Sequence, residues 1–197
     1  MEIPISRYLI LLLLPLFLIS CNEENDGEPV VFVGDSLVEG WKTNKCFPTY
    51  QTEKKGISGA RLEEALTWEI DAANKTVVFL IGTNNLGSVS FLPANFYLDF
   101  TDCYLRLIDS LGGKKNIVIS LLPRTLTGER PTINQEIKQL NAKLKEAFAP
   151  YDNILFLDVY DHFTDEEGNA NPHYFYDGLH LSDQGYNLLS SLLNVIL

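Results

Sequence analysis

The sequence predicts a three-layer α/β domain, in which helices cover both faces of a parallel sheet of about five strands. Short, continuous apolar runs recur along the chain, helical stretches separate them, and each run stops at a glycine, a proline or a polar residue. Continuous rather than alternating apolar character is typical of strands that are buried on both faces. Strands that alternate with helices imply crossover connections and therefore a parallel sheet.

Five segments are expected to form the strands. Four are clearly apolar and a fifth has a weaker signal; the clear ones are residues 29–33, 76–81, 116–122 and 153–157, and the weaker one is 50–55. Runs of this length suit strands, because helices need about ten residues or more. In open parallel sheets, sites form at the carboxyl ends of the strands, so the loops that follow these runs are the first places to search for chemistry.

Four segments are expected to be helical: residues 60–73, 96–111, 131–148 and 181–197. The second ends at Gly112–Gly113, a C-terminal stop signal. The fourth has Ser182 near its start, a residue type that is favoured as an N-cap.

Cys103 falls on the apolar face of the second expected helix, which favours an interpretation as a core residue. An exported compartment would also permit a disulfide between Cys103 and Cys46. The sequence leaves both alternatives open.

The N-terminus has the pattern of a secretory signal. Arg7 precedes an apolar run over residues 8–19, which is shorter than the roughly 20 residues that a spanning helix needs. The segment Leu18-Ile19-Ser20-Cys21 resembles a bacterial lipobox, which implies cleavage before Cys21 and lipidation of that residue. An ordinary signal peptide, or a membrane helix with an unrelated cysteine, is the alternative.

This interpretation divides the chain into a signal peptide (residues 1–20), a polar, acidic tether (21–28) and one domain (29–197). It predicts a lipid-anchored protein of the cell envelope. Asn22 after the cysteine favours the outer membrane or the periplasmic face by analogy.

The composition narrows the class of protein. Hydrophobic residues make up 46% and aromatic residues 11% of the chain, which is ordinary for a packed domain. The net charge of −11 excludes nucleic acid as a partner, since phosphates need a basic surface. The same charge disfavours electrostatic docking on anionic lipid, so membrane contact requires the anchor on Cys21.

Three strand-end loops carry polar residues of the kinds used in catalysis: residues 34–37 (GDSL), residues 82–85 (GTNN), and the pair Asp177 and His180. Each alone has a plainer interpretation. The first is a turn and helix N-cap, and the second is a glycine–asparagine turn. The third is a structural histidine, or half of a metal site for which His173 would be the nearby third ligand.

Together the blocks are much more specific. In chain order they are Gly34-Asp35-Ser36-Leu37, Gly56-Ile57-Ser58-Gly59-Ala60-Arg61, Gly82-Thr83-Asn84-Asn85 and Asp177-Gly178-Leu179-His180. This order resembles the SGNH (GDSL-type) hydrolase family over nearly the whole of the predicted domain. The resemblance implies a flavodoxin-like α/β/α fold, and it matches the four name-giving residues of the family to Ser36, Gly59, Asn84 and His180.

Two flanking segments, residues 121–124 (LLPR) and 176–182 (YDGLHLS), resemble the branch that contains platelet-activating-factor acetylhydrolase and bacterial relatives. That branch favours short acyl groups. Arg124 is also open to a plainer interpretation as the partner of an acidic neighbour.

The expected mechanism is ester hydrolysis with a serine nucleophile. Ser36 would attack the carbonyl, His180 would take its proton, and Asp177 would hold the imidazole. The backbone N–H groups of Ser36 and Gly59 and the amide of Asn84 would form the oxyanion hole. This chemistry requires no metal and no organic cofactor.

The expected substrate is a small O-acyl ester, such as an acetyl ester on a carbohydrate. Two alternatives remain: a lysophospholipase or thioesterase that acts on longer acyl chains, and a non-catalytic, surface-binding lipoprotein. Two neighbours of the nucleophile are expected to be structural, Asp35 as a brace of the turn and Trp41 as a packing residue.

Overall fold

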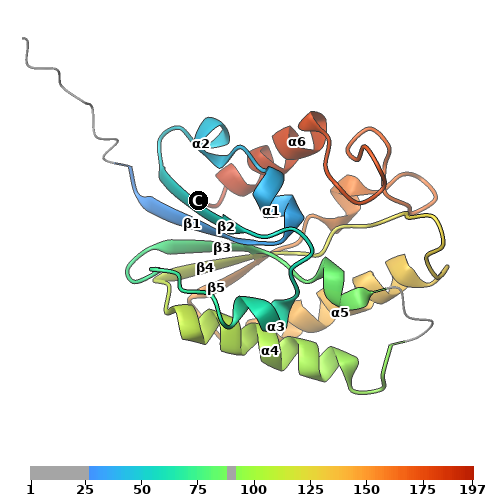
Figure 1. Cartoon of the computed structure of the whole chain (residues 1–197), viewed down its shortest axis with the longest axis horizontal. Coiled ribbons are helices and arrows are strands. Elements are labelled where there is room, and N and C mark those ends of the chain that lie inside the picture. The colour runs from blue at the N-terminus through green and yellow to red at the C-terminus, as the bar shows by residue number, and fades with distance from the viewer. Residues whose placement is uncertain (1–26, 88–91) are drawn as a thin grey trace, which may run out of the picture.

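The computed structural model describes residues 27–87 and 92–197 (Figure 1). The expected signal peptide, Cys21 and most of the expected tether lie outside the described residues. At the end of that tether, the carbonyl of Glu28 accepts a hydrogen bond of 3.1 Å from the backbone N–H of Gln51.

A five-stranded, fully parallel sheet forms the centre of the described chain, as predicted. Its strand order is β2-β1-β3-β4-β5. The strands are β1 (Pro29–Gly34), β2 (Gln51–Gly56), β3 (Thr76–Leu80), β4 (Lys115–Ile119) and β5 (Ile154–Leu157). The three inner strands are almost completely buried, whereas β2 at one edge is largely exposed, which explains its weak apolar signal.

The strand order contains a topological switch between β1 and β3. From β1 the chain moves outward to β2 and then returns to the other side of β1. Gly34 at the end of β1 pairs with Gly56 of β2 and with Leu80 of β3, so the three strands end level with one another. Ligands of such sheets bind at the carboxyl ends beside the switch, and the loops of residues 34–37 and 82–85 start there. The prediction that Asp177 and His180 also follow directly on a strand is wrong, because this pair lies between η2 and α6, well past the end of β5.

Helices cover both faces of the sheet (Figure 1). One apolar core joins the sheet to α3, α4 and α5, and a second core joins the other face to α1, α2 and α6. The helices are α1 (Ser36–Gly40), α2 (Thr43–Cys46), α3 (Leu62–Ala65), α4 (Phe96–Leu111), α5 (Ile133–Phe148) and α6 (Asp183–Asn194); two 3₁₀ helices are η1 (Thr83–Leu86) and η2 (Tyr160–Phe163). The predicted three layers are confirmed.

Helix ends follow the local signals of the sequence. Helix α4 stops at Gly112, whose φ of 61° lies in the left-handed region that glycine tolerates. At the start of α6, the hydroxyl of Ser182 accepts a hydrogen bond of 3.2 Å from the N–H of Gly185, which confirms the predicted N-cap.

The helix predicted over residues 60–73 is wrong in length, because only residues 62–65 are α-helical. The hydroxyl of Thr67 donates to the carbonyl of Glu64 at 2.8 Å, and the N–H of Trp68 bonds only three residues back, to Ala65. The N–H of Thr67 also bonds three residues back, to Glu64, so the helix ends in a tighter turn, while Trp68 and Ile70 still pack against the core.

Both described cysteines are free. Cys103 is buried in the core beneath α4, whereas Cys46 packs against the core on the opposite face of the sheet. The sheet therefore separates the two thiols, and the interpretation of Cys103 as a core residue is confirmed. None of the helices that the structure describes has both the length and the apolarity needed to cross a bilayer.

Candidate active site

The nucleophile candidate, Ser36, lies where β1 ends and α1 begins. Asp35 caps this helix, because its carboxylate accepts a hydrogen bond of 3.0 Å from the N–H of Leu37. Asp35 is fully buried, and burial raises its pKa to about 6, although the hydrogen bond from Leu37 acts in the opposite direction. The interpretation of Asp35 as a brace for the serine turn is confirmed.

Asp177 and His180 form a compact unit within one turn of chain. One carboxylate oxygen of Asp177 accepts the N–H groups of Leu179 at 2.9 Å and of His180 at 2.7 Å. The other lies 2.6 Å from Nδ1 of the His180 ring. Partial burial raises the pKa of Asp177, but these hydrogen bonds outweigh it and lower the pKa below its ordinary value. Asp177 is therefore a carboxylate at neutral pH.

The imidazole connects this unit to the nucleophile. Nε2 of His180 lies 3.0 Å from Oγ of Ser36, across 144 residues of sequence. Because Nδ1 faces a carboxylate, it carries the proton, and Nε2 is then free to accept from the serine hydroxyl. The carboxylate, imidazole and hydroxyl thus lie in one hydrogen-bonded line. The side chains of His180 and Asp177 are 30% and 39% exposed, so the line is open to a substrate.

Besides the N–H of Ser36 after β1, the candidate oxyanion donors lie in the loops after β2 and β3. Asn84 belongs to η1, and its amide donates to the carbonyl of Ala60 at 2.9 Å. An amide has two N–H groups, so the second remains for a substrate. Gly59, one residue before Ala60, has a φ of 77°, and a side chain there would meet no atom within 4 Å. The structure brings these two loops together, and the assignment of the oxyanion donors stays a prediction.

The turn interpretation of residues 82–85 also holds. Gly82 has a φ of 119°, and its carbonyl accepts from the N–H of Asn85 at 3.1 Å. Asn85 in turn accepts from the N–H of Leu62 at 3.0 Å. The turn therefore presents Asn84 while Asn85 fastens it to the start of α3.

One aromatic side chain was not singled out by the sequence. The ring of Tyr176 stacks on the ring of His180, with centroids 5.7 Å apart and planes 17° apart, and Tyr176 is 72% exposed. A tyrosine immediately before the predicted acid was the only available signal.

Trp41 is fully buried, and its indole N–H donates to the hydroxyl of Ser190 at 2.9 Å. The packing interpretation of Trp41 is therefore confirmed. The metal interpretation finds no support within residues 27–87 and 92–197, where no group of three His, Cys, Asp or Glu side chains is arranged to hold an ion. The ring of His173 packs edge-on against Tyr174.

Comparison with known proteins agrees with this geometry. Residues 32–188 match the model of the GDSL-like Lipase/Acylhydrolase family. The chain is 30% identical over 190 residues to platelet-activating factor acetylhydrolase IB subunit alpha1 of Rattus norvegicus, covering 89% of this chain and 78% of the relative.

Two solved structures show the same fold. A Streptococcus pneumonia protein named after platelet activating factor superposes with a TM-score of 0.70 and 27% identity, over 88% of this chain and 86% of its own. A GDSL-like lipase from Bacteroides thetaiotaomicron gives a TM-score of 0.66 and 26% identity, over 85% and 86%.

Proposed function

The chain belongs to the GDSL-like lipase/acylhydrolase family and is a carboxylic ester hydrolase, and on this premise we propose that it cleaves small O-acyl esters through an acyl-enzyme on Ser36. The observation that carries the proposal is the line from Asp177 through His180 to Ser36, with contacts of 2.6 and 3.0 Å. A serine hydroxyl is a weak nucleophile unless a base takes its proton, and this line supplies the base.

In the first half of the reaction, Oγ of Ser36 attacks the carbonyl carbon while its proton passes to Nε2 of His180. The imidazolium that forms is stabilised by the carboxylate of Asp177. The carbonyl oxygen becomes an oxyanion, which would accept from the N–H groups of Ser36 and Gly59 and from the amide of Asn84. When the intermediate collapses, His180 gives the proton to the departing alcohol and the acyl group stays on Ser36.

In the second half, a water molecule attacks the acyl-enzyme. His180 accepts a proton from the water, the same donors hold the second oxyanion, and the proton returns to Oγ of Ser36 as the carboxylic acid leaves. No step in this sequence requires a redox change or an additional reactant.

We further infer that the acyl group is short, as in acetyl, and that the alcohol can be a carbohydrate. The relative with 30% identity is named an acetylhydrolase, which supports a short acyl group. The exposed ring of Tyr176 beside His180 offers a flat surface of the kind on which a sugar ring stacks.

A series of p-nitrophenyl esters of increasing acyl length tests the acyl group. We expect the highest kcat/KM with acetate or propionate. A maximum at eight carbons or more would reject the short-acyl proposal and favour a lysophospholipase or thioesterase. Acetylated xylo-oligosaccharides test the alcohol part of the substrate, because the enzyme can release acetate from them only if its site binds a sugar.

A fluorophosphonate probe tests the nucleophile itself. We expect stoichiometric labelling of Ser36 in the folded chain and none in Ser36→Ala. Absence of labelling in wild-type protein would reject hydrolysis by this route and favour a non-catalytic binding protein.

Membrane anchoring through Cys21 is a separate proposal, supported by the lipobox-like residues 18–21. It places the enzyme in the cell envelope. Palmitate labelling and globomycin-sensitive processing are expected for wild type, and both should be lost in Cys21→Ala. Incorporation of palmitate into that variant would rule out Cys21 as the site.

A further inference from the structure

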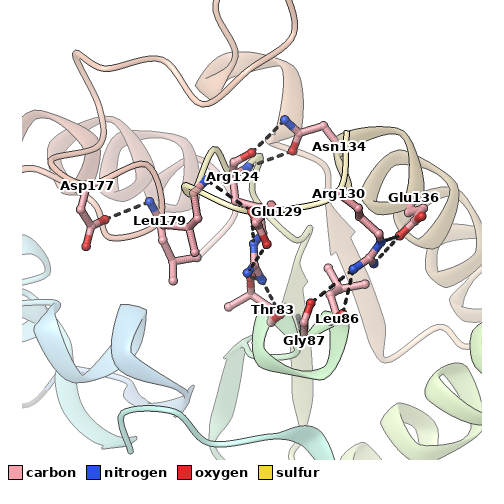
Figure 2. A network of polar contacts seen from close by, with 11 residues as sticks. Thr83, Leu86, Gly87, Arg124, Glu129, Arg130, Asn134, Glu136, Asp177 and Leu179 are labelled. Carbon is pink, nitrogen blue, oxygen red and sulfur yellow. Dashed lines mark hydrogen bonds and ion pairs between the residues drawn. The ribbon is translucent and has the colours of Figure 1, made fainter. Parts of the chain in front are cut away.

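The segment between β4 and α5 contacts both the loop of Asp177 and His180 and the turn that carries Asn84. We call residues 123–132 the bridging segment. Figure 2 shows two of its arginines, Arg124 and Arg130, pointing toward the turn that carries Asn84, while the loop of Asp177 lies on its other side. The side chains of these arginines are only 7% and 9% exposed.

Arg124 holds the start of η1. Its Nη1 donates to the carbonyl of Thr83 at 2.8 Å and contacts the hydroxyl of the same residue at 3.2 Å. Its other nitrogens engage the carboxylate of Glu129, with Nε to Oε2 at 3.0 Å and Nη2 to Oε1 at 2.5 Å. Glu129 therefore fixes one side of the guanidinium, and the other side bonds to Thr83, the residue directly before Asn84.

Arg130 holds the end of the same turn. Its Nη1 donates to the carbonyls of Leu86 at 3.2 Å and Gly87 at 3.3 Å. Its Nε donates to Glu136 at 2.6 Å. Burial raises the pKa of Glu136, but hydrogen bonds from Arg130 and Thr132 outweigh it and leave the pKa lowered. Asn84 thus lies between two backbone positions that buried guanidinium groups hold.

The bridging segment is itself well fixed. The backbone N–H and carbonyl of Arg124 both bond to the side-chain amide of Asn134 at 2.9 Å. On the other side, the N–H of Thr125 donates to the carbonyl of Gly178 at 2.8 Å. Gly178 directly follows the acid, Asp177, so one segment touches the loops of the acid–base pair and of the predicted oxyanion donor.

Stability alone is a poor explanation for the Arg124–Glu129 pair. Desolvation of a buried ion pair offsets most of its attraction, and apolar residues of similar size are often as stable. A positioning role explains the pair better, because a planar guanidinium fixes several acceptors in one geometry. Oxyanion donors act by preorganisation, and a displacement of about 1 Å costs roughly 10²-fold in rate.

We propose that Arg124, held by Glu129, is a positioning residue that sets Asn84 for oxyanion stabilisation through the carbonyl of Thr83. The inference rests on the proposed function, since it assigns a purpose to the placement of Asn84. Arg124 itself is almost completely buried and contacts no substrate atom in this account.

The test is a double-mutant cycle with Arg124→Lys and Asn84→Ala, measured with p-nitrophenyl acetate. Lysine keeps the charge, but its single amine nitrogen cannot bond to Glu129 and Thr83 in the same geometry as the planar guanidinium of arginine. We expect Arg124→Lys to lower kcat about 10-fold with KM changed less than about 2-fold, because an oxyanion donor acts mainly in the transition state. In the Asn84→Ala background, the same substitution should change kcat by less than about 2-fold.

Equal losses from Arg124→Lys in both backgrounds would overturn the proposal, because the arginine would then act independently of Asn84. An unchanged kcat in the single variant would overturn it as well. The matched control is Arg106→Lys on α4, where the arginine is exposed and no change is expected. Each kcat is divided by the number of sites that fluorophosphonate labels at its end point, so loss of folded protein is not counted as loss of rate.

If Arg124→Lys does not fold, Glu129→Gln replaces it in the cycle. Glutamine keeps the shape and one acceptor for the guanidinium, so a smaller loss of about 3-fold is expected, again only where Asn84 is present. Additive losses would contradict the proposal here too. Failure of the proposed function has a different signature, since wild type would then neither hydrolyse the ester nor be labelled at Ser36.

Discussion

The two halves of the candidate site are held in different ways. The acid, the base and the nucleophile's turn are fixed by neighbours two or three residues away: Asp35 bonds to Leu37, and Asp177 bonds to Leu179 and His180. Asn84 is fixed from a distance, by its bond to Ala60 and by two arginines that lie 40 and 46 residues further along the chain and hold the backbone on either side of it. Bonds within each turn thus hold the first half in place, whereas bonds to distant segments of the chain hold Asn84.

This difference predicts where mutations act. In the locally held half, the reacting residues and their immediate neighbours should matter most for turnover, with one remote contact, between Gly178 and Thr125. In the remotely held half, residues that never meet the substrate should matter through Asn84.

The largest effect is expected at the nucleophile and the base. Ser36→Ala and His180→Ala should each lower kcat for p-nitrophenyl acetate by at least about 10⁴-fold, and Asp177→Asn by roughly 10⁴-fold, because these groups act as one unit. Ser191→Ala, an exposed serine on α6, is the control and should be as active as wild type. Retention of more than a tenth of the activity in Ser36→Ala would show that Ser36 is not the nucleophile.

Asn84→Ala should come next. Loss of one oxyanion donor typically lowers kcat by about 10²–10³-fold with little change in KM. Steady-state kinetics with p-nitrophenyl acetate measure both constants, and Asn169→Ala at an exposed turn is the comparison. A change confined to KM would mean that Asn84 binds the ground state rather than the oxyanion.

Asp35→Asn tests the nucleophile's turn through stability. The pKa of Asp35 is raised to about 6 by burial, so between about pH 4 and pH 6 the folded chain binds a proton that the unfolded chain has released. The stability that Asp35 contributes is therefore fully present below about pH 4. It is lost as the pH rises to about 6, by up to about 3 kcal/mol at 1.36 kcal/mol per pKa unit.

Urea unfolding of wild type and Asp35→Asn at pH 4.5 and pH 7 measures this contribution. We expect wild type to lose more free energy of unfolding than the variant over this interval. Asp177 and Glu136, whose pKa values are lowered, lose their contributions at more acidic pH and are common to both proteins. Parallel pH dependences in the two proteins would show that Asp35 is ionised at both pH values.

The smallest effect is expected at Gly178, where the bridging segment meets the acid–base loop. A Cβ there would lie 2.1 Å from the carbonyl oxygen of Thr125, whereas at Gly168, with nearly the same φ (83° against 82°), it would meet nothing within 4 Å. Both alanine variants bear the strain of a positive φ, about 1 kcal/mol. Only Gly178→Ala should also lower kcat/KM, by about 10-fold, because it pushes two loops apart.

Equal kcat/KM values for Gly178→Ala and Gly168→Ala would show that the bridging segment does not control the acid–base loop. The bridging segment would then not couple the loop of Asp177 and His180 to the turn that carries Asn84, although the role of each part in catalysis would still stand.

The sequence predicted most of the sheet and the self-contained half of the site. Buried strands such as β3 and β4 are continuous apolar runs, and helices α4 and α5 have strong periodicity, so local pattern sufficed. Ser36, Asp177 and His180 could be named because their motifs occur together in the order that resembles the SGNH family, and the structure brings their side chains into contact.

The same resemblance named Asn84 and Gly59, but the side chains that hold Asn84 were much less predictable. The plainer interpretation of Arg124, as the partner of an acidic neighbour, is confirmed by Glu129, but nothing near Arg124 in the sequence points to the carbonyl of Thr83. The role of Arg130 was not predicted, because besides Glu136 its acceptors are backbone carbonyls of another loop. Local patterns predict hydrogen bonds to near neighbours and not those that the assembled fold creates. The shortened α3 was missed for another reason: Trp68 and Ile70 pack against the core without belonging to a helix, so apolar spacing alone could not show where the helix ends.

The most direct test of the central claim is to trap the acyl-enzyme. The enzyme is mixed with p-nitrophenyl acetate, quenched in acid within milliseconds, digested and analysed by mass spectrometry. We expect an acetyl group on the peptide that contains Ser36, present in wild type and absent from His180→Ala. Rapid hydrolysis by wild type with the acetyl group on another residue, or with none on Ser36 at any quench time, would contradict it.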